Sequence, residues 1–142
     1  MALGDGRIHA AKSVVHGSTT IASATNWAIN RDVVGSVDPG PAGSPGDADE
    51  ITTQKSILVT IVAMDEDELI ALLDATAADA ALGYYGEAGA AKTKTVKDVK
   101  FTRPPSPVAP AKDSGIPAGA FAITGRAQWG AGDTWATMVV TT

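Results

Sequence analysis

The sequence predicts a mainly β protein, an antiparallel β-sandwich or barrel of about six to seven strands with one flanking α-helix at residues 65–80. Three observations support this fold class. Several runs of strand length alternate apolar and polar residues, only one segment has the spacing of an amphipathic helix, and strands do not alternate with helices. The 142 residues are expected to form one domain, residues 1–142.

Two segments near the N-terminus are predicted to be the first strands. Residues 6–17 have strand character, and residues 19–35 place Trp27, Ile29 and Val33 on one face of an extended chain. We expect these two runs to pair with each other as an opening β-ribbon.

Residues 36–50 interrupt the alternation and are predicted to form a long loop without regular structure. The segment is rich in proline and glycine, which break helices and strands. Loops of this length inside a compact domain are uncommon and often functional. Two interpretations stay open, a solvated hairpin loop and an arm that becomes ordered against a partner.

Residues 51–64 form the strongest predicted strand. Ile57, Val59 and Ile61 share one face, and the later half of the segment is apolar on both faces. A strand with two apolar faces is covered on both sides, so we expect it at the centre of the sheet.

The predicted helix at residues 65–80 follows directly. Its apolar residues are spaced three or four apart and would form one stripe, which consists of Leu69, Leu72, Leu73, Thr76 and Ala80. We expect the helix to end near Gly83, because glycine commonly follows the last helical residue.

Four carboxylates at the start of this helix could bind a metal, transfer protons or only begin the helix. With Asp65 as the N-cap, Glu68 falls at the third helical position and would complete a capping box. Glu66 and Asp67 then lie in the first turn, where the helix dipole favours negative charge. A calcium loop of the EF-hand type does not fit, because Leu69 stands where an oxygen ligand is needed. We therefore predict a helix start.

The remaining strands are predicted in the C-terminal half. Residues 92–103 form one strand, with a bulge where the apolar parity slips between Val96 and Val99. Residues 104–117 form a proline-rich linker that is expected to run over the surface in extended form. Next, residues 118–130 alternate apolar and polar side chains and form another strand.

The end of the chain is predicted to be a hairpin. Trp129 and Trp135 flank a glycine-containing connection, and residues 134–142 form the last strand.

The strand at residues 92–103 carries a basic stripe. Positive charge on a strand discourages pairing at a sheet edge, which is the simpler interpretation. The alternative is that the stripe meets the acidic residues Asp65, Glu66, Asp67 and Glu68 of another copy of the chain. The basic residues in question are Lys92, Lys94, Lys97, Lys100 and Arg103.

Several function classes are disfavoured by what the sequence lacks. It has no cysteine, nucleophile elbow, Walker loop or dinucleotide-binding glycine motif, and its two histidines, His9 and His16, have no nearby cluster of ligands. We expect no enzyme activity, no cofactor and no metal. The formal charge of −5 disfavours a protein that grips DNA, and no signal peptide or membrane segment is predicted, so we expect a soluble protein.

The order of these segments resembles the phage tail tube proteins, a family related in fold to the tube proteins of type VI secretion. The likeness lies in a strand ribbon, a long Gly/Pro loop, and a central strand that ends in "IVAMDEDELIALLDATAADA" before further strands. It implies that six copies form a ring and that rings stack into a hollow tail tube. The loop would contact the next ring through Asp38, Pro39, Pro41, Pro45, Asp47, Asp49 and Glu50.

The same resemblance implies the partners and the location. The protein would bind itself and other tail proteins, such as the tape measure, the baseplate and possibly a sheath, and genomic DNA would pass through the lumen without sequence-specific binding. It would be assembled in the cytoplasm of the bacterial host and reside in the tail of the virion. The role of the linker at residues 104–117 stays open.

Other functions also fit the sequence. Within assembly proteins they are a head decoration protein, a baseplate component or a secretion tube. A carbohydrate-binding β-sandwich would need an exposed aromatic platform, for which Trp129 and Trp135 are the candidates.

Overall fold

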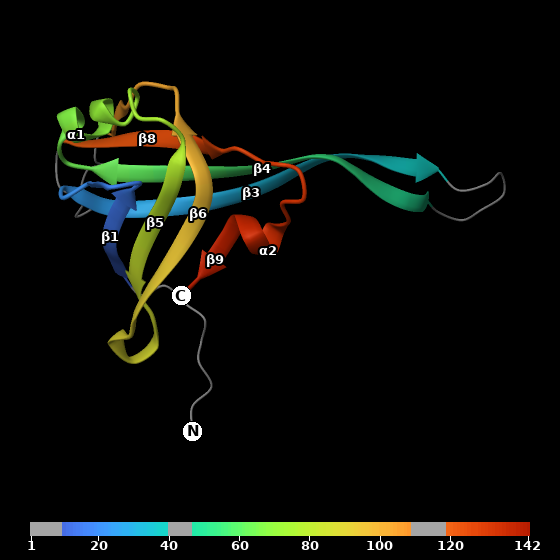
Figure 1. The fold of residues 1–142 in the computed structure, drawn as a ribbon, viewed down its shortest axis with the longest axis horizontal. Coiled ribbons are helices and arrows are strands. Elements are labelled where there is room, and N and C mark those ends of the chain that lie inside the picture. The colour runs from blue at the N-terminus through green and yellow to red at the C-terminus, as the bar shows by residue number, and fades with distance from the viewer. Residues whose placement is uncertain (1–9, 40–46, 109–118) are drawn as a thin grey trace.

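The computed structural model describes residues 10–39, 47–108 and 119–142. In these residues the chain forms one antiparallel sheet with short helical segments (Figure 1), which confirms the mainly β fold class. The helical segments are α1 (Glu66–Ala71), η1 (Glu87–Gly89) and α2 (Trp135–Met138). The strands are β1 (Ala10–His16), β2 (Thr19–Thr20), β3 (Ala24–Pro39), β4 (Asp47–Ala63), β5 (Ala78–Tyr85), β6 (Ala91–Phe101), β7 (Ser106–Val108), β8 (Ala120–Ala127) and β9 (Val139–Thr141).

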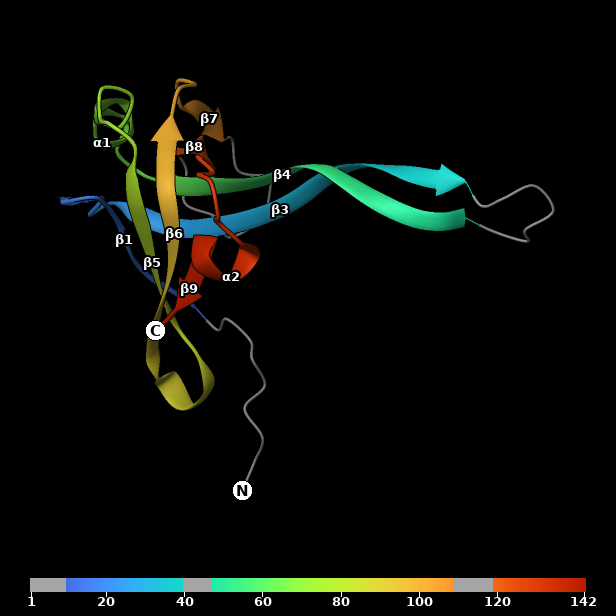
Figure 2. The ribbon, with the colours of Figure 1, turned by 45° about the vertical axis from the view of Figure 1, so that its right-hand side comes forward.

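The sheet has the order β2-β1-β5-β6-β8-β4-β3, with β7 beside β8 and β9 beside β6. It folds over itself, so that β1, β5 and β6 cross the direction of β3, β4 and β8 (Figures 1 and 2). The two halves bury a common core, in which Leu82 and Val96 of one half are clustered with Ile61 and Ile123 of the other. The expected two-layered architecture is therefore built from a single open sheet.

A tryptophan links the two halves of the folded sheet. The indole Nε1 of Trp27 in β3 donates a hydrogen bond of 2.9 Å to the carbonyl oxygen of Gly83 in β5. Its ring also packs edge to face on Tyr84, with the ring centroids 6.0 Å apart. This contact joins the two halves without a backbone ladder.

The predicted central strand and the predicted bulge are both confirmed. Ile57, Val59 and Ile61 of β4 are fully buried, and β4 lies between β3 and β8. In β6 the register slips where predicted, because Val96 and Val99 lie opposite residues of β5 that are only two positions apart. The extra residues of β6 include Asp98, whose φ of 50° re-aims the strand.

The predicted helix at residues 65–80 is too long, since α1 ends at Ala71. Leu69 and Leu72 are buried as expected, but Ala80 is buried in a strand. The reason is tertiary: from Ala78 onward the chain lies between β1 and β6, and the two ladders satisfy its backbone N–H and C=O groups as a helix would. The alanines of this segment favour a helix, but intrinsic propensity is a weak preference that tertiary pairing overrides.

The opening β-ribbon is also wrong. The first strand β1 meets β2 over two residue pairs only, and its main partner is β5. The second predicted strand, β3, pairs along its whole length with β4 instead. β3 therefore pairs with the strand that follows it in the sequence instead of the one that precedes it.

The C-terminal hairpin is replaced by a helical turn. Thr134 caps α2, with its side chain accepting from the Thr137 backbone while Thr137 reaches back to the Thr134 N–H. This capping box starts a turn that buries Met138, and the chain then pairs with β6 as β9. The last strand, β9, therefore pairs with β6 and not with β8, as a hairpin would require.

The proline-rich linker is partly regular. Ser106, Pro107 and Val108 form β7, which pairs with the outer edge of β8. Proline is tolerated at such an edge because its missing N–H would face away from the ladder. The rest of the linker, residues 109–118, lies outside the described residues.

The predicted irregular loop at residues 36–50 is mostly strand. The ladder between β3 and β4 continues to the pair of Pro39 and Asp47. Proline causes no loss there, since it is the last residue of its strand. The result is a two-stranded arm, here defined as residues 33–39 and 47–55, that projects far from the rest of the molecule (Figures 1 and 2).

Candidate assembly surfaces

The base of the arm is exposed to solvent. Residues 31–35 of β3 and 54–55 of β4 are exposed although they include apolar side chains, and Val33 is 46% exposed. Successive residues of a strand point to opposite faces, so both faces of the ribbon are exposed at residues 33–35 and 54–55. A two-stranded ribbon with two solvated faces is marginally stable by itself.

The arm also carries most of the net negative charge, since its four carboxylates and one lysine give −3 of the chain's −5. Between residues 32 and 54 the chain has five carboxylates and no lysine or arginine, and the other 11 acidic residues balance the chain's 11 basic ones. The register places Asp38 directly opposite Asp49, with Val37 opposite Glu50. The arm is thus the part of the molecule where negative charge is concentrated.

The loop residues that the sequence assigned to contact between rings divide into two groups. Most of them lie on the arm's strands, whereas Pro41 and Pro45 lie outside the described residues. Their contact with a neighbouring ring stays a prediction. The residues on the strands are Asp38, Pro39, Asp47, Asp49 and Glu50.

The base of the arm is held by two tryptophans. The Lys55 ammonium lies 5.6 Å from the ring centroid of Trp129 and 5.8 Å from that of Trp135. The two rings meet edge to face, 5.0 Å apart at 87°. Perpendicular rings under an ammonium group offer no single flat face to a sugar, so the geometry does not favour the carbohydrate platform.

The acidic start of α1 is a helix cap, as predicted, but without the capping box. Asp65 is the N-cap, and its carboxylate accepts the Asp67 N–H at 3.0 Å. Glu68 does not reach back to the cap. It accepts instead from the backbone N–H of Ala22 at 2.7 Å and of Ser23 at 3.3 Å. Glu68 therefore ties α1 to the turn before β3.

Three of the basic residues on β6 already have partners in their own chain. Lys94 donates to the hydroxyl of Thr141 at 3.0 Å, and Lys100 donates to a backbone carbonyl in the turn after α1. Lys97 forms a salt bridge of 2.9 Å with Asp133. Their predicted contact with another copy stays untested.

The salt bridge shifts both of its partners. The hydrogen bond and charge of Asp133 raise the pKa of Lys97 above 10.5. The hydrogen bond from Lys97, with a second from the Gly130 N–H, lowers the pKa of Asp133 below 3.8.

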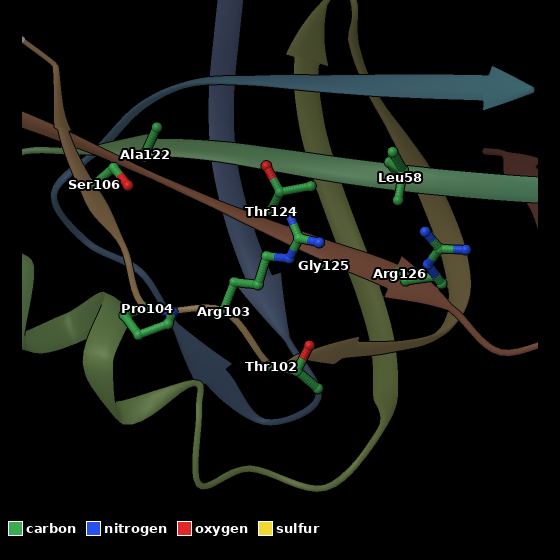
Figure 3. Close-up of a pocket in the computed structure, with 9 residues that line it drawn as sticks. All are labelled: Leu58, Thr102, Arg103, Pro104, Ser106, Ala122, Thr124, Gly125 and Arg126. Carbon is green, nitrogen blue, oxygen red and sulfur yellow. The ribbon is translucent and has the colours of Figure 1, made fainter.

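A polar groove of about 440 Å³ lies on the outer face of β4 and β8 (Figure 3). Its floor includes Leu58 and Thr124, and its wall is the segment that leads from β6 to β7. Two arginines line it, Arg103 from that wall and Arg126 from β8, and both are exposed. The sequence placed Arg103 in the basic stripe but gave no signal for Arg126, which reads as an ordinary polar position of an alternating strand.

The described residues hold no cluster that suggests metal binding. No group of three or more His, Asp or Glu side chains able to hold a metal ion occurs among them. His16 is buried, with Nε2 2.7 Å from the carbonyl oxygen of Val99 and its ring against Phe101, while His9 lies outside the described residues. Nor does any helix in the described part of the chain have the length and hydropathy to cross a membrane.

Comparisons with known proteins give one informative likeness. No protein-family model matches the chain, and no curated protein matches it either. Among solved structures it is similar to the tube-terminating cap of the anti-feeding prophage, with a TM-score of 0.51 and 17% sequence identity. The match covers 92% of this chain and 86% of the cap. At this identity the likeness establishes a shared fold.

Proposed function

We propose that this protein is a structural component of a phage tail or a tail-like particle, whose copies associate into rings, six to a ring, that stack into a hollow tube. The fold is shared with a protein that terminates a tube. The observation that carries the proposal is the arm, since a ribbon with two uncovered faces gains stability when another subunit covers it.

The arm also favours contacts in which one surface of a copy meets a different surface of the next copy. It projects on one side of the molecule, so it can meet a different surface on the neighbour (Figure 1). Contacts between unlike surfaces build rings when the rotation closes and filaments when it does not. A tube of stacked rings needs contacts that close each ring and contacts that repeat along the tube from one ring to the next.

The proposal includes the partners and the location. The protein would contact other tail proteins, among them the tape measure, the baseplate and possibly a sheath, and it would be found in the tail after assembly in the host cytoplasm. We expect no catalytic activity and no cofactor. With its net negative charge, a tube of this protein would let DNA pass by repelling the phosphates.

Removing the arm tests the proposal. Val34 and Gln54 are paired across the ladder, so replacing residues 35–53 by Asn-Gly joins them through a two-residue hairpin turn. We expect this variant to unfold at the same temperature as the full-length protein, because the core lies elsewhere. Negative-stain micrographs should show rings or tubes for the full-length protein and none for the variant.

A matched control shortens the other exposed hairpin. Replacing residues 86–90 by Asn-Gly joins Tyr85 to Ala91, which are also paired, and this variant should assemble normally. Full-length protein that stays monomeric at high concentration while folded would overturn the proposal. Normal tubes from the variant without the arm would show that other surfaces drive assembly.

A tube-terminating cap is a second candidate, because the structural match with such a cap spans most of both chains. A cap would form single rings that do not stack. Rings without tubes, seen over a wide range of concentrations, would favour the cap, whereas tubes would exclude it.

A further inference from the structure

We propose that the groove between Arg103 and Arg126 receives the acidic arm of a second copy of this chain, with the two guanidinium groups binding the carboxylates around Asp38 and Asp49. This inference rests on the proposed function, since it names the surface that the arm meets. The groove is positively charged, the arm is negatively charged, and the two lie far apart within one molecule.

The groove presents two positive charges that the described residues leave unpaired. No carboxylate in residues 10–39, 47–108 and 119–142 is found at ion-pair distance from Arg103 or Arg126. Figure 3 shows both side chains extending along the same face of β8 and β4. The hydroxyls of Ser106 and Thr124 line the groove beside them. Arginine forks bind carboxylates through two parallel hydrogen bonds, so this groove is suited to acidic side chains.

The arm carries the matching charge in an unfavourable arrangement. Asp38 faces Asp49 directly across the ladder, and Asp47 and Glu50 belong to the neighbouring pairs. Like charges at opposite positions of a ladder destabilise it. Arginines inserted beside them convert this repulsion into attraction, so binding a cationic groove stabilises the arm.

The arm cannot reach the groove of its own molecule. Leu58 in the groove and Asp49 in the arm are nine positions apart on the same strand, and an extended strand of that length spans about 30 Å. The contact is therefore between copies, and it joins unlike surfaces. A contact of this kind propagates from one copy to the next, as the assembly of a tube requires.

The other exposed acidic group is less suited to the groove. The charges at the start of α1 are already stabilised, because Asp65 caps the helix and Glu66 and Asp67 lie in its first turn. Those carboxylates gain less from an arginine than a pair of opposed aspartates gains.

Exchange of charges between the two surfaces tests the inference. The variants R103E/R126E and D38K/D49K are prepared in the full chain and studied by sedimentation velocity over a range of concentrations. Each variant alone should associate at least about tenfold more weakly than the unmodified protein, because both contacts become repulsive. An equimolar mixture of the two should associate again, since each then offers the other an opposite charge.

The design contains its controls. Lysine at both arm positions keeps two like charges opposite each other, so the arm of D38K/D49K is no more strained than before. The variant K12E/T19E/T20E changes the net charge by the same amount as R103E/R126E at exposed sites away from the groove, and it should associate normally. Circular dichroism and thermal unfolding verify that each variant is folded.

The possible results separate this inference from the proposed function. A folded, unmodified protein that never associates overturns both. If it associates and R103E/R126E associates equally well, only the groove is wrong. If R103E/R126E associates again when mixed with E66K/D67K but not when mixed with D38K/D49K, the groove binds the start of α1 of a second copy. This result also overturns the inference. The inference is also overturned if R103E/R126E associates like the unmodified protein but no longer binds a short DNA duplex. That result would show that the two arginines bind phosphates.

Discussion

Asp133 lies in the segment between β8 and α2 and receives two hydrogen bonds. The Gly130 N–H donates at 2.6 Å and the Lys97 ammonium at 2.9 Å. The Asp133 side chain is only 9% exposed, whereas that of Lys97 is 44% exposed. One residue therefore fastens the connection before α2 to the bulged part of β6.

The shifted pKa values fix the pH range in which this contact stabilises the fold. The pKa of Asp133 is lowered from 3.8, so its contribution is fully present above pH 3.8 and is lost as the pH falls through the lower, folded value. The pKa of Lys97 is raised from 10.5, so its contribution is fully present below pH 10.5 and is lost as the pH rises through the higher value.

Asp133→Asn should therefore lower the stability in a pH-dependent way. The amide keeps an acceptor for the Gly130 N–H but removes the charge that holds Lys97. We expect a lower unfolding temperature than that of the unmodified protein near neutral pH, and a difference that shrinks well below pH 3.8. Asp74→Asn, at an exposed carboxylate, serves as the control and should show no such dependence. A difference for Asp133→Asn that persists in acid would assign the effect to packing instead of charge.

Single side chains mark the limit of what the sequence predicts. The N-cap at Asp65 follows from its position before a helical stripe, and the structure confirms it. The role of Glu68 could not be predicted, because its partners Ala22 and Ser23 lie more than 40 positions away in the chain. Local spacing points to the Asp65 N–H as the donor to Glu68, but that N–H donates to the Ser23 hydroxyl instead.

Glu68→Ala tests this tie at the level of the element α1. Loss of two charge-assisted hydrogen bonds on a partly exposed group should lower the free energy of unfolding by about 1–2 kcal/mol. Glu66→Ala is the matched control, since Glu66 is exposed and contributes through the helix dipole only, about 0.3–1 kcal/mol. Denaturant unfolding measures both. Equal losses for the two variants would show that the hydrogen bonds to the turn contribute nothing.

Elements that carry their own signal were predicted well. The strand β4 and the bulge in β6 follow from the parity of apolar residues, which a sheet imposes at every position. The boundary between α1 and β5 could not be read in this way. Alanine and threonine fit either structure there, and the choice depends on which ladders are available on both sides of β5.

The arm shows why the largest feature of the whole molecule was missed. Proline and glycine at residues 39–46 indicated a loop, and this signal was extended over neighbouring residues that pair as strands. An antiparallel ladder needs backbone groups, which Asp38 and Asp49 supply as well as apolar residues do. The groove was invisible for a related reason, since Arg103 and Arg126 come together only through the pairing of β6 and β8.

At the scale of the whole molecule, the segment from Trp129 to Trp135 contacts the base of the arm through Lys55. Lys55 is paired with Val33 at the base of the arm, and its ammonium rests on Trp129 and Trp135. Both views place α2 beside the point where β3 and β4 leave the body (Figures 1 and 2). An arm that bridges copies at defined positions needs such a support, because a small rotation at its base moves its far end by many ångströms.

Lys55→Met should loosen the arm without unfolding the body. It keeps most of the side chain's length but removes the cation–π contacts, each worth about 0.5–1 kcal/mol at an exposed site. We expect amide hydrogen exchange of the ladder from Val33 outward to accelerate by about five- to thirtyfold, with unchanged exchange in the core. Lys12→Met is the matched control, since Lys12 lies 5.9 Å from the ring of Tyr85 on the far side of the sheet. The effect of Lys12→Met on exchange should be confined to β1 and β5. Equal exchange rates in the arms of the two variants would show that the tryptophans do not hold the arm.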